Sequence, residues 1–284
     1  MKPAPSPHTV GNETQGAEEN VNRQLRTIVF FLLGLSTVVL TGAEAQDRFS
    51  KAQGYENEMR WSEALSAYVE ILKKDPTNAQ AQYRLGVVQA KLGATDEALR
   101  SYQEALRLHP GMNEARQALE GYYINQGITF RRAHQSAEAI QAFQQALTYN
   151  SSSATAYFEM GEEYDQLGQP DASITAYQQA ITLDPDKSAA HARLAAVYAK
   201  RGQSQQAARE FQEVLRLNPQ DPVAHHGLGV AYSELGQRDE AIASLQQAIR
   251  FYLIAGQRDK AQPAYDLQKK LLAEKAALTS GKKK

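Results

Sequence analysis

Three of the six histidines come nearest to a metal site by type and spacing: His191, His225 and His226. A metal centre needs several ligands close together, yet no carboxylate stands at ligand spacing beside these residues. His191 and His225 are instead separated by a distance that recurs along the sequence. We therefore expect them to serve helix packing, with no metal bound.

Glu162, Glu163 and Asp165 could supply acid and base groups for catalysis. They fall on one predicted helix with no pocket implied, so we expect a solvated face. The sequence has no glycine-rich phosphate loop, no HExxH and no G-x-S-x-G motif. It also lacks cysteine, which rules out disulfides, thiolate zinc sites and a cysteine nucleophile. We predict that the protein is not an enzyme and needs no cofactor.

The composition is that of a folded, helical protein. Of its 284 residues, 42% are hydrophobic and 22% are charged, which is close to the globular average. Alanine and glutamine are abundant, and this favours helix over strand. The 31 basic and 32 acidic side chains nearly balance. No nucleic-acid partner is expected, because binding to phosphates needs clustered Lys and Arg.

Beyond Gln46 the sequence repeats itself at a fixed period. The distance from Pro76 to Pro110 is the same as the distance from Pro185 to Pro219. Each repeat holds two helical patterns of about 13 residues, joined by a short turn. The period defines six units, at residues 45–78, 79–112, 120–153, 154–187, 188–221 and 222–255.

Small residues occupy two fixed places in every unit, as close contact between helix backbones requires. The eighth place holds Ala52, Gly86, Gly127, Gly161, Ala195 and Gly229, and the twentieth holds Ala64, Ala98, Ala139, Ser173, Ala207 and Ala241. Bulky aromatic residues recur between these places. Glycines 93, 168, 202 and 236 end first helices, where a positive φ favours glycine; the first unit has Met59 there. Prolines end the second helices.

This pattern resembles the tetratricopeptide repeat family, whose repeating unit is about 34 residues long. The resemblance covers residues 46–255. It implies an all-α fold, a right-handed superhelix (α-solenoid) of six helix-turn-helix repeats with a C-terminal capping helix. It also implies a concave groove, lined by the first helices, that holds a peptide or helix of a partner protein.

Departures from the pattern make local predictions. The extra residues 113–119 add two helical turns, which should lengthen the first helix of the third unit without rotating its buried face. The sixth unit has Leu253 in place of proline, so its second helix should run longer. Residues 256–284 should form a capping helix, from Asp259 to Leu278, and a basic tail. The apolar candidates of this helix are Tyr265, Leu267, Leu271, Leu272 and Leu278.

The N-terminal region differs from the repeats. Residues 1–27 are rich in proline and polar residues, and we expect a disordered cytoplasmic segment. Residues 28–45 read as the end of a signal peptide or as a single-pass anchor, because residues 28–40 are apolar and about 17 residues can just span a bilayer. Arg23 and Arg26 precede this run and favour a cytoplasmic N-terminus.

Two fates of this segment stay open. Ala43-Glu44-Ala45 fits a signal-peptidase site with cleavage before Gln46, and a start at Val21 would leave a compact signal. A cleaved signal predicts an exported, periplasmic protein. A retained segment predicts an inner-membrane anchor through residues 28–43, with the repeats outside the cytoplasm.

The resemblance places the fifth residue of each unit, which lies on its first helix, in the groove. In the first four units this place holds Phe49, Tyr83, Ile124 and Phe158. Exposed rings are frequent anchors in protein interfaces, so we expect a partner to contact them. The alternative is that these rings pack against neighbouring helices.

Charges on the same surface are segregated. Basic residues fall in the second and third units, at Arg84, Lys91, Arg131 and Arg132, and acidic residues fall in the fourth, at Glu159, Glu162 and Asp165. Such a groove would orient its ligand. Alternatively, Arg131 pairs with Glu162 or Asp165 between adjacent repeats.

We therefore predict a non-enzymatic scaffold or assembly factor of the cell envelope that binds another protein in its groove. The alternative is a membrane-anchored platform that recruits parts of a complex in the envelope or a photosynthetic membrane. The sequence leaves the partner's identity and the oligomeric state open.

Overall fold

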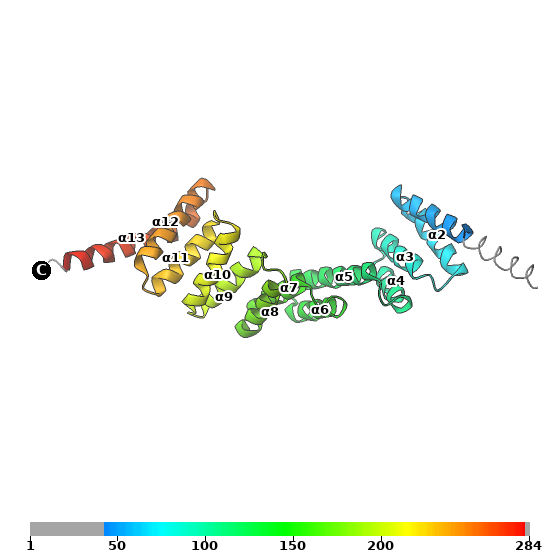
Figure 1. The fold of residues 1–284 in the computed structure, drawn as a ribbon, viewed down its shortest axis with the longest axis horizontal. Helices are drawn as coiled ribbons and strands as arrows, with labels where there is room; N and C mark the ends of the chain where they lie inside the picture. The colour runs from blue at the N-terminus through cyan, green and yellow to red at the C-terminus, as the bar shows by residue number, and fades with distance from the viewer. Residues whose placement is uncertain (1–42, 282–284) are drawn as a thin grey trace, which may run out of the picture. The chain divides into compact units, whose positions relative to one another are not determined.

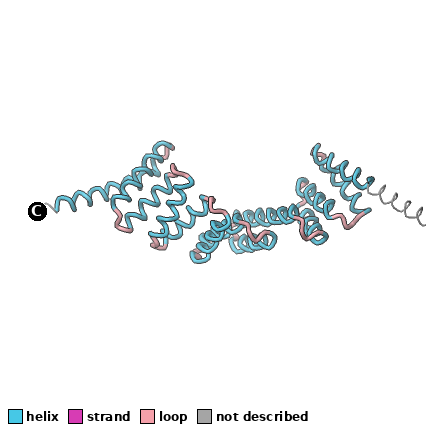
Figure 2. The backbone as a smooth tube through the Cα atoms, viewed as in Figure 1, coloured by secondary structure: helices cyan, strands magenta, loops and turns pink. Residues whose placement is uncertain are grey.

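The computed structural model describes residues 43–281, which fold almost entirely into helices (Figure 1). Short loops join these helices, and no strand occurs within residues 43–281 (Figure 2). The chain divides between Ala115 and Arg116 into two compact units, here called the N-terminal and the C-terminal body. The all-α prediction is confirmed.

None of the helices within residues 43–281 combines the length and the apolar character needed to cross a bilayer. The apolar run 28–40 and the predicted segment 1–27 lie outside the described residues, so the signal or anchor stays a prediction. Of the predicted cleavage site, Ala43, Glu44 and Ala45 are described, and they are part of a helix over residues 43–57.

In the N-terminal body the helix pairs follow the predicted units. The first unit pairs residues 43–57 with α2 (Trp61–Lys74), and the second pairs α3 (Ala79–Lys91) with α4 (Thr95–Leu108). Their buried side chains include Ala52, Ala64, Tyr68, Leu85 and Val88. Alanines at the crossings let the helices approach closely, and the larger side chains fill the space beside them.

Most of the C-terminal body consists of the other four predicted units, followed by one more helix. Its helices are α5 (Asn113–Arg132, which begins in the N-terminal body), α6 (Ser136–Tyr149), α7 (Ala154–Gln166), α8 (Pro170–Leu183), α9 (Ser188–Lys200), α10 (Ser204–Leu217), α11 (Pro222–Glu234), α12 (Arg238–Ile254) and α13 (Arg258–Gly281). Helix α5 has 20 residues against 13 in α7, which confirms that the insertion lengthens it. Helix α12 has 17 residues against 14 in α10, as the missing proline predicts.

Helix α13 packs on α12, which confirms the predicted cap, but part of its predicted apolar face is wrong. Leu271 is buried there with Ala261 and Ala264. Tyr265, Leu272 and Leu278 are exposed instead. The reason is geometric: the two alanines allow a close approach between the helices, and the larger flanking residues are left outside the contact.

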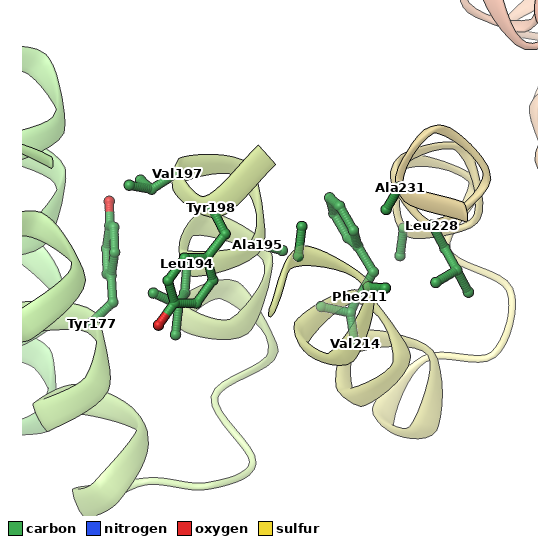
Figure 3. Close-up of a cluster of buried hydrophobic side chains, with 12 residues drawn as sticks. Tyr177, Leu194, Ala195, Val197, Tyr198, Phe211, Val214, Leu228 and Ala231 are labelled. Atoms are coloured by element: carbon green, nitrogen blue, oxygen red, sulfur yellow. The ribbon is translucent and has the colours of Figure 1, made fainter. Parts of the chain in front are cut away.

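Glycine at the eighth place of a unit faces a bulky side chain at the twenty-fourth. A Cβ added at Gly161 would lie 2.6 Å from the ring of Tyr177, and one at Gly86 would lie 2.7 Å from the ring of Tyr102. Cβ atoms essentially never come so close, so the ring leaves no room for a side chain at these two glycines. Figure 3 shows a buried cluster of the C-terminal body, where Tyr177 and Phe211, both at the twenty-fourth place, pack with Leu194 between successive helices.

The turn between the two helices of a unit needs a positive φ at its fifteenth place. The four predicted glycines adopt it, with φ between 68° at Gly168 and 79° at Gly93. Met59 and His134 occupy the same place in the first and third units and also have a positive φ, of 57° and 59°. The turn's hydrogen bonds thus hold a left-handed backbone even where glycine is missing.

Candidate partner-binding surface

The candidate surface lies on the first helices of the units. Four of its predicted residues belong to the N-terminal body (Phe49, Tyr83, Arg84 and Lys91), and six belong to the C-terminal body (Ile124, Arg131, Arg132, Phe158, Glu162 and Asp165). Lys91 and Arg132 are exposed, and the other eight are half-buried.

The aromatic residues of this surface pack against rings of their own units. Phe49 lies on Tyr68, Tyr83 on Tyr102 and Phe158 on Tyr177, with 5.8 Å between ring centroids in each pair. Ile124 packs against the buried cluster that contains Phe143. The packing alternative is therefore confirmed, although each side chain keeps part of its surface exposed.

Arg131 joins α5 to α7 through three carboxylates. Its Nε donates to Glu163, one terminal nitrogen donates to Glu162 Oε2 at 2.9 Å, and the other lies 2.5 Å from Glu159 Oε2. Burial alone would lower the pKa of Arg131, but its contacts with Glu159 and Glu163 outweigh burial and raise that pKa above its ordinary value. The guanidinium is therefore permanently charged, with all its nitrogens engaged.

A polar cavity of about 240 Å³ opens beside this cluster. It is lined by Arg131, Glu162, Glu163, Asp165, Gln166, Tyr177 and Arg193, and we call it the Glu163 cavity. Arg193 on α9 lies 3.0 Å from Glu162, while Lys200 donates to both oxygens of Asp165 at 2.9 and 3.0 Å. Helices of three consecutive units thus contribute charges to one small volume.

These contacts show which of the predicted groove charges pair with one another. Arg131 pairs with Glu162, as the alternative reading expects, but Asp165 pairs with Lys200 of the next unit. In the N-terminal body, Arg84 lies 3.5 Å from Glu56. Most groove charges are therefore matched between neighbouring units.

The family follows from the comparison of this repeat with known sequences. Profiles of the tetratricopeptide repeat match residues 49–113, 124–187, 158–222 and 199–253. The chain belongs to the tetratricopeptide repeat family. No curated protein matches this sequence.

Solved structures share this tetratricopeptide repeat fold. "Crystal structure of YrrB: a TPR protein with an unusual peptide-binding site" is 21% identical, covers 72% of this chain and 100% of its own, and has a TM-score of 0.51. "Crystal structure of MamA protein" is 24% identical and covers 61% and 91%, with a TM-score of 0.45. "Crystal structure of PilW, widely conserved type IV pilus biogenesis factor" is 19% identical and covers 78% and 98%, with a TM-score of 0.44.

Within the tetratricopeptide repeat, Glu163 is the residue that sequence reasoning placed wrongly. We expected it on a solvated face, and it has no exposed surface. It stands at the tenth place of its unit, where Val88, Val197 and Ala231 are buried in other units. Aligning the units at the tenth place would therefore have predicted that Glu163 is buried. A carboxylate is tolerated there because the guanidinium of Arg131 pairs with it.

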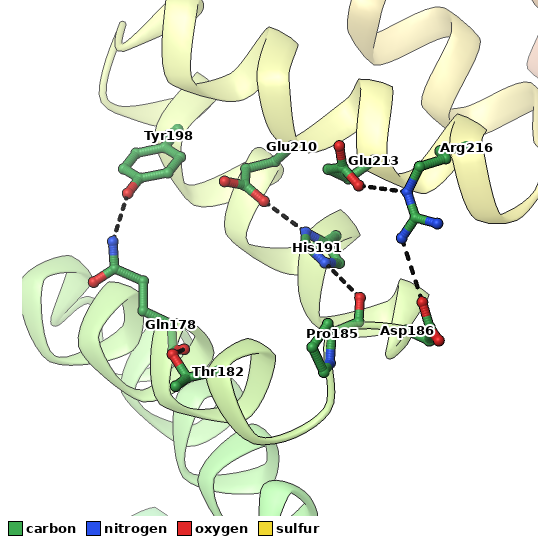
Figure 4. Close-up of polar contacts among 9 residues, drawn as sticks. All are labelled: Gln178, Thr182, Pro185, Asp186, His191, Tyr198, Glu210, Glu213 and Arg216. Carbon is green, nitrogen blue, oxygen red and sulfur yellow. Dashed lines mark hydrogen bonds and ion pairs between the residues drawn. The ribbon is translucent and has the colours of Figure 1, made fainter.

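Two of the three candidate histidines, His191 and His225, make packing contacts, as expected. His191 is buried, with Nδ1 at 2.7 Å from Glu210 and Nε2 at 3.1 Å from the Pro185 carbonyl (Figure 4). The carboxylate absent from its sequence neighbourhood thus comes from α10. His225 contacts the Pro219 carbonyl in the same way. Within residues 43–281 no group of three or more potential metal ligands assembles.

Proposed function

We propose that this tetratricopeptide repeat protein is a non-enzymatic scaffold that holds a segment of a partner protein against α5, α7 and α9. Repeats of this family are interaction modules, and stacked repeats present extended binding surfaces. The observation that carries the proposal is the Glu163 cavity, which places charged and hydrogen-bonding groups of three consecutive units in one opening. Its Tyr177 also contacts the half-buried ring of Phe158.

An extended peptide is the first occupant to test. YrrB is described as a TPR protein with an unusual peptide-binding site. A single segment laid across α5, α7 and α9 of this chain would meet the ring of Phe158 and the charges of the C-terminal body. At protein interfaces a few buried aromatic and arginine side chains carry most of the binding energy.

A displayed library of random 12-residue peptides, selected on the immobilised full chain, tests the proposal. We expect related sequences whose affinity falls at least about tenfold on Gln166→Trp, because Gln166 is exposed and lines the cavity. Gln179→Trp adds the same bulk at an exposed position of α8 and should leave affinity unchanged. No enriched sequence, or equal losses in the two variants, would overturn the proposal.

We further propose that the partner belongs to an assembly of the cell envelope. The support is the apolar run 28–40, with arginines before it and Ala43-Glu44-Ala45 after it. Intact mass spectrometry of the expressed protein decides between its fates. A mass beginning at Gln46 supports export, a full-length mass in the membrane fraction supports the anchored platform, and a full-length protein outside the membrane fraction contradicts both.

A further inference from the structure

The Glu163 cavity carries more negative than positive charge. The charged residues of its lining, together with the residues that pair with them, are four carboxylates (Glu159, Glu162, Glu163 and Asp165) and three cations (Arg131, Arg193 and Lys200). One carboxylate charge is therefore left without a cation. Moreover, the side chains of Arg193 and Lys200 are 58% and 65% exposed, so solvent screens their contribution.

Two oxygens at this cavity are buried and lack a partner among the described residues. They are Oε2 of Glu163 and Oη of Tyr177, and neither side chain has exposed surface. Buried polar atoms are nearly always hydrogen-bonded, because leaving water without a replacement bond costs free energy. Both residues line the cavity, so a donor that enters it and displaces the atoms covering these two oxygens can supply the missing bonds.

Arg131 cannot supply these bonds itself. Its nitrogens are already directed to Glu159, Glu162 and Glu163. Burial raises the pKa of Tyr177, so its hydroxyl stays protonated and its oxygen can accept a bond from a cationic donor. The cavity therefore lacks one positively charged donor.

We propose that the Glu163 cavity receives the ammonium or guanidinium group of a lysine or arginine side chain of the bound protein segment. This rests on the proposed function, since the side chain must belong to a partner. A volume of about 240 Å³ holds several waters at roughly 30 Å³ each, and so admits the end of a long side chain. An acidic side chain would add to the surplus charge and is excluded from the site.

Titration with N-acetyl-arginine amide tests the site without knowledge of the partner. The full chain would be labelled with ¹⁵N, and N-acetyl-citrulline amide, which has nearly the same shape without the charge, serves as the matched probe. We expect saturable shifts of the amide signals of residues 162–166 with the arginine probe. The citrulline probe should shift them little at the same concentration.

Two variants remove charge from the site with little change in shape. Glu162→Gln and Asp165→Asn should each weaken arginine binding, by about tenfold for Glu162→Gln. Glu213→Gln removes an exposed carboxylate that pairs with Arg216 at 2.7 Å on α10 and should leave binding unchanged. Equal shifts with both probes, or unchanged binding in folded Glu162→Gln and Asp165→Asn, would overturn the inference.

The inference and the proposed function can fail separately. If the arginine probe binds but no library peptide is enriched, the scaffold proposal fails, and with it the assignment of the cation to a partner, while the affinity of the cavity for a guanidinium stands. If peptides are enriched but replacing their Lys and Arg residues by citrulline leaves affinity unchanged, the cation site fails and the scaffold proposal stands.

Discussion

The carboxylate of Glu163 is fully buried on α7, and it accepts a hydrogen bond from Nε of Arg131, which lies 32 residues earlier on α5. The same guanidinium also engages Glu159 and Glu162. One arginine thus neutralises a buried charge and joins the first helices of two consecutive units.

Removing Arg131 should strongly destabilise the C-terminal body. Arg131→Met leaves Glu163 buried without its cation, and losing one partner of a buried pair costs about 3 kcal/mol or more. Chemical denaturation measures the change in the free energy of unfolding. Arg216→Met is the control, because Arg216 is exposed and its pairs with Glu213 and Asp186 should contribute less than about 1 kcal/mol. Similar losses in the two variants would contradict the assigned burial of Glu163.

Two glycine substitutions should have opposite signs. Gly161→Ala places a Cβ 2.6 Å from the ring of Tyr177, and such overpacking should cost about 1–3 kcal/mol. Gly121 on α5 has nothing within 4 Å of an added Cβ, so Gly121→Ala should stabilise by about 0.5–1 kcal/mol through its higher helix propensity. Thermal melts of both variants check the prediction, and equal shifts would show that the units are aligned wrongly.

Glycine should stabilise the two turns that lack it. Met59 and His134 adopt a positive φ, which costs an L-residue about 1 kcal/mol or more. Met59→Gly and His134→Gly should each regain part of this energy and raise the melting temperature. Gly168→Ala, at the same place with no atom within 4 Å of the added Cβ, should lower it. A loss of stability in Met59→Gly and His134→Gly would show that their side chains contribute more than the backbone strain costs.

Phe158→Ala should reduce stability. The sequence alone left open whether this ring contacts a partner or packs against neighbouring helices. The ring is half-buried against Tyr177, with the ammonium of Lys187 5.3 Å from its centroid. We expect a loss of about 2 kcal/mol, below the range for a fully buried ring. Leu167→Ala, at a side chain that is 45% exposed, should cost less. Affinity for a selected peptide, measured on the folded fraction of Phe158→Ala, separates a binding role from packing.

Acidification should destabilise the C-terminal body through His226. Burial lowers the pKa of His226 below its ordinary value of 6.5. As the pH falls below 6.5, the imidazole of His226 binds a proton more readily in the unfolded chain than in the folded chain. The free energy of unfolding therefore falls. Denaturation at pH 7 and pH 5 should show a smaller decrease for His226→Gln than for the parent protein. His109→Gln, at an exposed histidine, should behave like the parent.

The period of the sequence was enough to predict the helices, because each unit repeats the same small, bulky and turn residues. It also predicted the lengths of α5 and α12, since an insertion and a missing proline act locally. The environment of Glu163 could not be read in this way. Its burial depends on Arg131 of the preceding unit, and a single unit does not contain that information.

The environment of the predicted groove residues could not be predicted from their place in the repeat alone either. The fifth place was assigned to the groove by resemblance, but whether a ring there is free depends on the side chain at the twenty-fourth place. In three units that residue is Tyr68, Tyr102 or Tyr177, each large enough to cover one face of the ring. Likewise, Asp165 pairs with Lys200, which no rule about adjacent places in one unit would select.

The contact between the eighth and the twenty-fourth place of a unit also has a kinetic consequence. Gly86 meets Tyr102, Gly161 meets Tyr177 and Gly229 meets Leu245, so each contact closes a loop shorter than half a repeat. Short loops form at low entropic cost, and chains dominated by such contacts fold fast. Each helix pair can therefore nucleate on its own, and neighbouring pairs then dock in turn. Amide hydrogen exchange should be slowest in interior pairs and fastest at the terminal ones, where one stacking partner is missing.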